Sequence, residues 1–159
     1  MTQQVELVAA APSEEPILAN LLELYGHDFS EFHPVELGPE GRFGYPRLAL
    51  YWSEPQRHPF LVRVDGRLAG FALVVSGSVC DMAEFFIVRR YRRRGIGVEV
   101  AKKVWRQFTG PWEVRVMESN RAGREFWERA IAQFVAVPVP PVRVERNGVD
   151  WMVFSFESV

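Results

Sequence analysis

Residues 85–97 read FFIVRRYRRRGIG, and they contain the most informative pattern in the chain. An apolar run typical of a buried strand leads into five arginines in six positions, interrupted only by Tyr91. Gly95 and Gly97 follow, and apolar residues then recur with helical spacing as far as Phe108. The pattern predicts a strand, a basic glycine loop and an amphipathic helix in direct succession.

The junction between this loop and the helix suits an anion. The first turn of a helix has backbone N–H groups without partners inside the helix, and the positive end of the helix dipole lies there. Glycines let a backbone approach a ligand closely, and guanidinium groups match the oxygens of a phosphate. The stretch therefore predicts a phosphate or pyrophosphate site at the start of the helix.

Other interpretations of the loop were weighed against this one. A Walker loop requires Gly-Lys followed by Ser or Thr, which the stretch lacks. A Rossmann fingerprint requires a third small residue where Val100 stands, and a strand that opens a parallel array. A solvated charged turn stays open for individual arginines. A nucleic-acid patch is disfavoured, because such a patch spreads over a face and interleaves stacking aromatic side chains.

The composition is that of an ordinary globular protein. Of 159 residues, 48% are hydrophobic and 13% aromatic, and the formal net charge of −1 gives no general attraction to DNA or a membrane. We expect one domain, residues 1–159. The single cysteine, Cys80, excludes an internal disulfide framework and is interpreted as a packing residue. The sequence shows neither a signal-peptide pattern nor a membrane-length apolar run, so we expect a cytoplasmic protein.

Alternating apolar residues predict a sheet, with single strands at 5–10, 79–88 and 112–117. Two further pairs of strands form hairpins around Asp65-Gly66 and Asn147-Gly148, dipeptides that favour two-residue hairpin turns. Consecutive hairpins make the sheet largely antiparallel. The passage from strand 79–88 through a helix to strand 112–117 gives the one parallel pair.

Helical spacing predicts three helices between these strands. The first runs from Ser13 to Gly26, where the glycine ends it, and the second covers 96–108. The third is capped by Asn120 and has Ala122, Phe126, Ala130 and Phe134 on one side. Residues 27–57 are irregular and aromatic, with a helical turn or two around 46–53, and such segments often line a site. The fold class is therefore mixed α/β.

The spacing Arg92-x-x-Gly95-x-Gly97 resembles the acetyl-CoA signature of the GNAT superfamily of N-acetyltransferases. The resemblance continues through the amphipathic helix, the strand WEVRVM and the segment NRAGREFWERAI at 120–131, and it covers about the last hundred residues. It implies a central, mostly antiparallel sheet of six or seven strands flanked by helices, with strands 79–88 and 112–117 splayed apart to admit the cofactor.

The resemblance also implies which residues bind the cosubstrate acetyl-CoA. The amides from Arg93 to Val98 would wrap the pyrophosphate, and the edge of the preceding strand would pair with the pantetheine arm. Asn120 would contact the same arm, although a helix cap alone also explains it. The implied set is Phe86, Ile87, Val88, Arg89, Arg92, Arg93, Arg94, Gly95, Ile96, Gly97, Val98 and Asn120. No metal is implied.

Acetyl transfer requires an uncharged amine, and only about one in 10³ lysine-like amines is uncharged at pH 7. Glu84 is the candidate general base, because it stands three residues before Ile87 on the strand that would carry the thioester. Glu84 could equally be a surface carboxylate or the structural ion-pair partner of an arginine. A backbone N–H at Ile87 or Val88 would stabilise the developing oxyanion.

The clearest departure from the family pattern is Trp127. Relatives commonly place a tyrosine seven residues after the Asn, where it protonates the leaving thiolate, and an indole N–H is no such acid. Because a thiol has a reference pKa of about 8.5, leaving unprotonated costs about 2 kcal/mol. Trp127 could supply a hydrogen bond, Tyr45, Tyr51 or water could supply the proton, and Trp127 could equally be a core residue.

These observations favour an N-acetyltransferase that uses direct attack in a ternary complex, because no cysteine or serine has a suitable base beside it. The acceptor would be a small amine, a peptide N-terminus or a lysine. A CoA-binding sensor without activity is the alternative function, and a nucleic-acid-binding module is a weaker one. The C-terminal hairpin could provide the edge of a homodimer.

Overall fold

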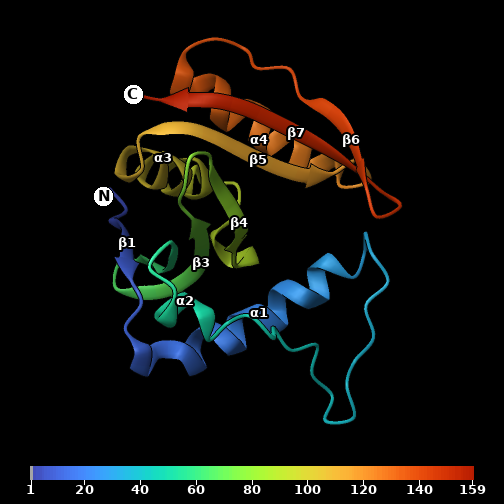
Figure 1. The fold of residues 1–159 in the computed structure, drawn as a ribbon. Helices are drawn as coiled ribbons and strands as arrows, with labels where there is room; N and C mark the ends of the chain where they lie inside the picture. The colour runs from blue at the N-terminus through green and yellow to red at the C-terminus, as the bar shows by residue number, and fades with distance from the viewer. Residues whose placement is uncertain (1) are drawn as a thin grey trace.

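The computed structural model describes residues 2–159, and a seven-stranded sheet runs through its centre in the order β1-β2-β3-β4-β5-β7-β6 (Figure 1). All neighbouring strands are antiparallel except β4 and β5, which confirms the predicted mixed α/β fold with one parallel pair. The strands are β1 (Val5–Ala9), β2 (Arg57–Val64), β3 (Arg67–Val75), β4 (Cys80–Ile87), β5 (Gly110–Met117), β6 (Val142–Arg146) and β7 (Val149–Ser158).

Helices cover the two faces of the sheet. The helices are α1 (Glu15–Phe29), α2 (Leu50–Ser53), α3 (Ile96–Gln107) and α4 (Arg121–Val135). One apolar core lies between the sheet and α3 and α4, and it contains the fully buried Trp105 and Trp112. A second core on the opposite face joins α1 and α2 to β2, β3 and β4 through Leu18, Tyr51 and Phe71. Within residues 2–159, no helix is long and apolar enough to cross a bilayer.

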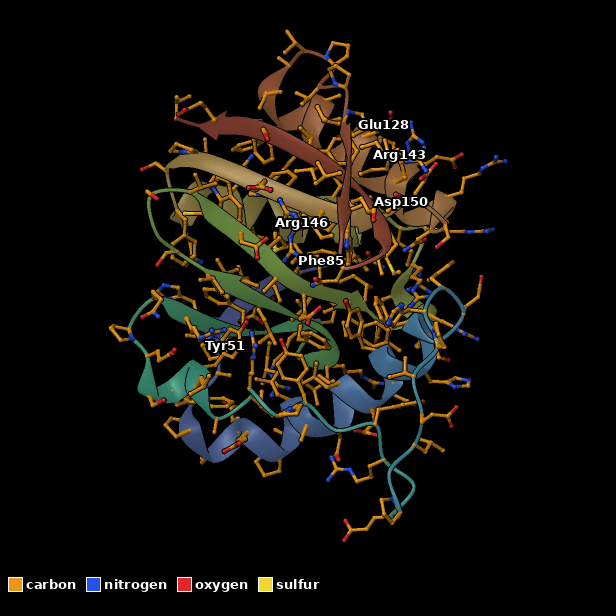
Figure 2. All side chains as sticks on the ribbon, turned by 45° about the vertical axis from the view of Figure 1, so that its right-hand side comes forward. Tyr51, Phe85, Glu128, Arg143, Arg146 and Asp150 are labelled. Atoms are coloured by element: carbon orange, nitrogen blue, oxygen red, sulfur yellow. The ribbon has the colours of Figure 1, made fainter. Side chains whose placement is uncertain are left out.

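Both predicted hairpin turns form. Asp65 and Gly66 have φ values of 50° and 79°, and Asn147 and Gly148 have values of 54° and 76°. Left-handed values at both central residues match the twist of the strands that the turn connects. Figure 2 shows Arg143 and Asp150 close together on the β6–β7 hairpin, where Arg143 Nη2 donates to Asp150 Oδ2 over 2.8 Å.

An extra residue in β4 reverses which side chains face which core. Leu73 of β3 lies opposite Glu84, but Val74 lies opposite Met82, so Ala83 forms a β-bulge. Before the bulge, Met82 packs into the core beneath α3 and α4. After it, Glu84 reaches Tyr25 of α1 instead. The bulge therefore brings the candidate base onto the α1 side of the sheet.

The parallel pair is short. Only Cys80 with Trp112 and Asp81 with Glu113 are in register, and the two strands separate beyond these pairs (Figure 1). Near the narrow end of the opening, Arg115 Nη2 donates to Asp81 Oδ2 over 2.9 Å. Most of β4 consequently has an edge that β5 does not occupy, as expected for a splayed sheet.

Two predictions about the helices were wrong. Helix α1 does not stop at Gly26 but continues to Phe29. A Cβ at Gly26 would lie 3.1 Å from the ring of Phe43, so the glycine accommodates a packed aromatic ring and not a helix end. In α4, Ala122 is exposed, contrary to the prediction, whereas Phe126, Ala130 and Phe134 face the core as predicted, together with Trp127 and Ile131.

The contact between β3 and β4 generates the first testable prediction. A Cβ at Gly70 would lie 2.0 Å from the carbonyl oxygen of Phe86, so Gly70→Ala must push the strands apart. We expect the free energy of unfolding to fall by about 1–3 kcal/mol, measured by urea denaturation. Gly77→Ala is the matched control, because its Cβ would come no closer than 3.7 Å to Val79. Equal stability of the two variants would contradict the expectation.

Candidate active site

The loop between β4 and α3 has the conformation of an anion cradle. Residues Arg89–Tyr91 form one turn of 3-10 helix, and Arg93 and Gly95 then adopt left-handed φ values of 62° and 76°. A Cβ on Gly95 would meet no atom within 4 Å, so the backbone angle and not crowding calls for a glycine here. Left-handed residues alternating with ordinary ones turn successive N–H groups into one concavity.

The amides of this loop are available to a ligand. Within residues 2–159, no protein acceptor bonds the backbone N–H of any residue from Arg93 to Val98, whereas the amides of Arg92 and Glu99 bond to Arg89 and Gly95. An ordinary helix leaves four amides free. The longer free run, next to the positive end of α3, fits a diphosphate better than a single carboxylate.

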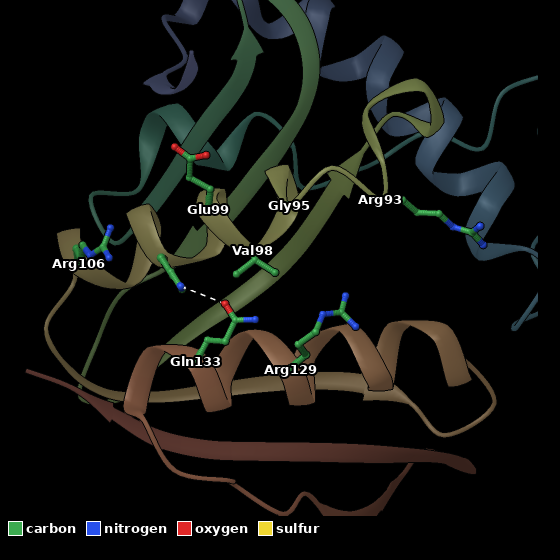
Figure 3. Close-up of a pocket in the computed structure, with 8 residues that line it drawn as sticks. Arg93, Gly95, Val98, Glu99, Arg106, Arg129 and Gln133 are labelled. Carbon is green, nitrogen blue, oxygen red and sulfur yellow. Dashed lines mark hydrogen bonds between the residues drawn. The ribbon is translucent and has the colours of Figure 1, made fainter. Parts of the chain in front are cut away.

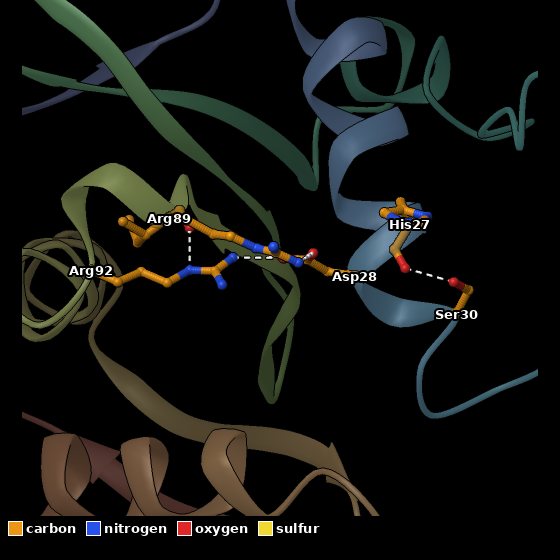
Figure 4. A network of polar contacts seen from close by, with 6 residues as sticks. His27, Asp28, Ser30, Arg89 and Arg92 are labelled. Atoms are coloured by element: carbon orange, nitrogen blue, oxygen red, sulfur yellow. Dashed lines mark hydrogen bonds and ion pairs between the residues drawn. The ribbon is translucent and has the colours of Figure 1, made fainter.

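The five arginines of the loop have different surroundings. Arg89 and Arg92 each donate from Nη2 to an oxygen of Asp28, both over 2.7 Å (Figure 4). Arg90 and Arg94 lie over the ring of Tyr91, at 5.9 and 5.8 Å from its centroid. Tyr91 is buried, as expected of a packing residue. Arg93 lines an open groove.

That groove lies between α3 and α4 and has a volume of about 610 Å³ (Figure 3). Besides Arg93, three basic residues line it: Lys102, Arg106 and Arg129. Lys102 Nζ donates to Gln133 Oε1 over 3.3 Å across the groove. Sequence reasoning missed these residues, because each lies on the polar face of its own helix and only the packing of α3 beside α4 brings them together.

Gly97, the second glycine of the motif, is required for a different reason from the predicted one. A Cβ at Gly97 would lie 2.9 Å from the ring of Phe126 and 3.7 Å from Ile87. The absent side chain therefore lets α3 and α4 pack closely at the mouth of the groove. Close approach of an anion is not needed to explain Gly97.

The free edge of β4 presents particular amides. The N–H of Val88 donates to Ala69 on the β3 side over 2.8 Å, so it is not available to an oxyanion, contrary to one of the two predicted positions. Along a strand, the backbone N–H and C=O groups of successive residues point to opposite sides. The backbone groups of Phe86 therefore also point toward β3, and those of Phe85 and Ile87 point toward β5. A ligand lying between the strands would meet these two residues.

Glu84 is held between two tyrosines. Tyr25 of α1 donates to Oε1 over 2.9 Å, and Tyr45, which precedes α2, donates to Oε2 over 3.0 Å. Burial raises the pKa of Glu84 above its ordinary value, and the two hydroxyl donors offset only part of that rise. Burial, with the nearby Glu84 charge, also raises the pKa of both tyrosines, so they stay protonated donors.

The irregular segment is anchored on α1. Glu23 accepts the amide of Phe43 over 2.7 Å and that of Gly44 over 2.8 Å, one on each carboxylate oxygen. These two hydrogen bonds fix the backbone immediately before Tyr45. Tyr45 thus brings the segment 27–57 to Glu84, and that this segment lines a site stays a prediction. Nothing in the sequence indicated the contact from Tyr25.

Trp127 and Asn120 both have structural roles. Trp127 is only 8% exposed and packs edge to face against Phe85 and Phe126, with centroids 5.0 and 4.8 Å away. Asn120 Oδ1 accepts the amide of Gly123 over 2.9 Å and caps α4. A Cβ at Gly123 would lie 2.5 Å from the Asn120 side chain, which explains that glycine. Contacts of either residue with a cofactor remain predictions.

Comparison with protein-family models identifies one match, the acetyltransferase (GNAT) family, over residues 18–131. The match covers more than two thirds of the 159 residues. No curated protein sequence matches this chain.

Solved structures share the fold at low sequence identity. An acetyltransferase from Thermus thermophilus superposes with a TM-score of 0.72 at 16% identity, over 97% of both chains. A GNAT-family acetyltransferase from Streptococcus pneumoniae gives 0.68 at 15%, over 98% of this chain and 100% of the other. A spermidine N-acetyltransferase from Vibrio cholerae, solved with CoA and spermine, gives 0.67 at 13%, over 98% and 96%.

The environment of Glu84 leads to a prediction about its titration. Removing a hydroxyl donor, by Tyr25→Phe or Tyr45→Phe, should raise the pKa of Glu84 further, because each donor stabilises the ionised form. Carboxyl-carbon NMR titration of the labelled glutamates measures this. Tyr91→Phe is the control, since its hydroxyl makes no bond to Glu84. A Glu84 pKa unchanged in both variants would rule out the two tyrosines as donors.

Proposed function

The chain belongs to the GNAT acetyltransferase family, and from that premise we propose that it transfers an acetyl group from acetyl-CoA to a primary amine by direct attack. One observation carries the proposal. A partly buried carboxylate, Glu84, stands on a bulged strand whose edge is free and which runs directly into a row of unbonded amides. This arrangement combines a base, a channel and an anion cradle within one strand and loop.

The residues present fit the cofactor. The amides from Arg93 to Val98 would hold the diphosphate, and the backbone of Phe85 would pair with the pantetheine arm. Arg93 and Arg129, at the loop end of the basic groove, would meet the remaining phosphate. When bound, acetyl-CoA supplies an activated acetyl thioester. Within residues 2–159, no cluster of His, Cys, Asp or Glu side chains is arranged to hold a metal ion.

Glu84 would take the proton of the acceptor amine, directly or through water. Its raised pKa makes it a stronger base than an exposed glutamate, while Tyr25 and Tyr45 keep its carboxylate in a fixed orientation. The N–H of Ile87, which points into the opening, is the remaining predicted donor to the oxyanion.

None of Trp127, Tyr45 and Tyr51 is well suited to protonate the departing thiolate. Trp127 is not acidic, and burial raises the pKa of Tyr45 and Tyr51, which makes both weaker acids than an exposed tyrosine. Since unprotonated departure costs only about 2 kcal/mol at neutral pH, we propose that the thiolate leaves as the anion or takes its proton from water.

The acceptor is proposed only as a primary amine. The Vibrio cholerae structure contains spermine, but at 13% identity it indicates the fold and not the substrate. The alternative function, a CoA-binding sensor, is favoured by one observation. Trp127 occupies the position of the usual tyrosine and packs as a core residue.

Cofactor binding is tested by thermal melting. Acetyl-CoA at about 100 times its dissociation constant should raise the melting temperature by roughly 5–10 °C, because it binds only the folded state. Release of free thiol over a panel of amines then separates the enzyme from the sensor. Stabilisation without turnover of any amine would favour the sensor, and the absence of any stabilisation would contradict both.

The role of Glu84 is tested by Glu84→Gln, which should lower kcat by about 10²-fold or more. In the wild type, kcat should fall as the pH drops through the raised pKa of Glu84, above the ordinary 4.5, because the protonated carboxyl cannot act as a base. The variant should lose this dependence. Glu128 is an exposed residue of α4 (Figure 2), so Glu128→Gln is the control and should retain wild-type kcat. Full activity of Glu84→Gln would exclude Glu84 as the base.

A further inference from the structure

The last turn of α1 touches both halves of the candidate site. Tyr25 and Asp28 stand three residues apart, on the same side of the helix. Tyr25 donates to Glu84, and Asp28 accepts from Arg89 and Arg92 at the start of the cofactor loop. One rigid helical turn therefore holds the base and the loop in a fixed relation.

Arg92 is held at three points. Its Nε donates to the carbonyl of Ile87 over 2.7 Å, and its Nη2 donates to Asp28 over 2.7 Å (Figure 4). Its guanidinium also lies 5.5 Å from the centroid of the Phe86 ring. The carbonyl of Ile87 belongs to the edge of β4 that β5 leaves free. Arg92 thus ties the end of β4, the loop and α1 together.

The charges at this point are only partly balanced within the protein. The two ion pairs share a carboxylate that is only 24% exposed. Burial alone would raise the pKa of Asp28, but the hydrogen bonds and charges of Arg92 and Arg89 outweigh it and lower the pKa below its ordinary value. Asp28 stays ionised at neutral pH and offsets one of the two positive charges.

We propose that Asp28 and Arg92 are positioning residues that brace the cofactor loop against α1, and that Arg92 does not bind phosphate although it opens the glycine signature. The inference rests on the proposed function. Phosphate binding would then depend on the loop amides and on Arg93 and Arg129, which line the groove and make no ion pair with the described residues.

The geometry makes the Arg92→Lys variant diagnostic. Arginine bonds Ile87 and Asp28 from two different nitrogens of one rigid fork, whereas lysine has a single ammonium and cannot reproduce that arrangement. A phosphate contact, by contrast, would be weakened but not lost in this variant, because lysine keeps the positive charge and binds phosphate as a point charge. Arg92→Lys therefore separates a brace from a phosphate contact.

The experiment measures binding of CoA to the full chain by titration calorimetry. We expect Arg92→Lys, Arg92→Gln and Asp28→Asn each to raise the dissociation constant about tenfold. Asp28→Glu should restore binding to within roughly threefold of the wild type, because it returns the acceptor. Arg90→Lys is the matched control for a loop arginine without an ion pair among residues 2–159, and it should bind CoA like the wild type.

Two further readouts distinguish a brace from a general loss of structure. The double variant Asp28→Asn with Arg92→Gln should bind no more than about threefold more weakly than either single variant, because both remove the same contact. The salt dependence of CoA binding should stay at the wild-type slope in Arg92→Gln and become shallower in Arg93→Gln, which removes a phosphate contact.

Wild-type affinity of Arg92→Lys together with a shallower salt slope in Arg92→Gln would overturn the proposal, because Arg92 would then be a phosphate ligand. Unchanged affinity in all three brace variants would also overturn it. If Asp28→Asn does not fold, the comparison of Arg92→Lys with Arg90→Lys decides the question. Failure of the wild type to bind CoA would instead refute the proposed function, and the inference with it.

Discussion

The early parting of β4 from β5 is the constraint on which the rest of the site depends. A parallel pair that stayed in register along its whole length would occupy the backbone groups of Phe85 and Ile87. Only two residue pairs form, and the bulge at Ala83 lies immediately beyond them. The same bulge turns Glu84 toward α1. The bulge in β4 therefore lies next to the edge that β5 leaves free, and it places the carboxylate of Glu84 near that edge.

Helix α1 makes this irregular region rigid. Free edges and glycine loops are ordinarily the mobile parts of a fold. Here Glu23 fixes the segment that carries Tyr45, Tyr25 reaches Glu84, and Asp28 holds the loop arginines. The proposed acyl transfer would require such rigidity, because a displacement of about 1 Å between donor and acceptor can cost a hundredfold in rate.

The sequence predicted those features of the fold that depend on residues close together in the chain. The Asp-Gly and Asn-Gly dipeptides indicated both hairpins, and the period of the helix after Gly97 indicated its buried face. It could not predict features that depend on contacts between distant segments. Gly26 was taken for a helix end because the ring of Phe43, which it accommodates, comes from another segment. The basic groove was missed for the same reason, since α3 and α4 each contribute only part of it.

The run of arginines from Arg89 to Arg94 illustrates why a local cluster of charge does not by itself indicate the ligand. Five like charges in six positions suggest a surface for a polyanion, yet the chain carries a net charge of −1. In the structure, Arg89 and Arg92 face a carboxylate, Arg90 and Arg94 flank the ring of Tyr91, and Arg93 alone lines the groove. Nucleic acid requires charges spread over a face, whereas these five exposed arginines are gathered on one loop. Such an arrangement fits the proposal that the loop binds a compact anion while Arg89 and Arg92 are held by Asp28.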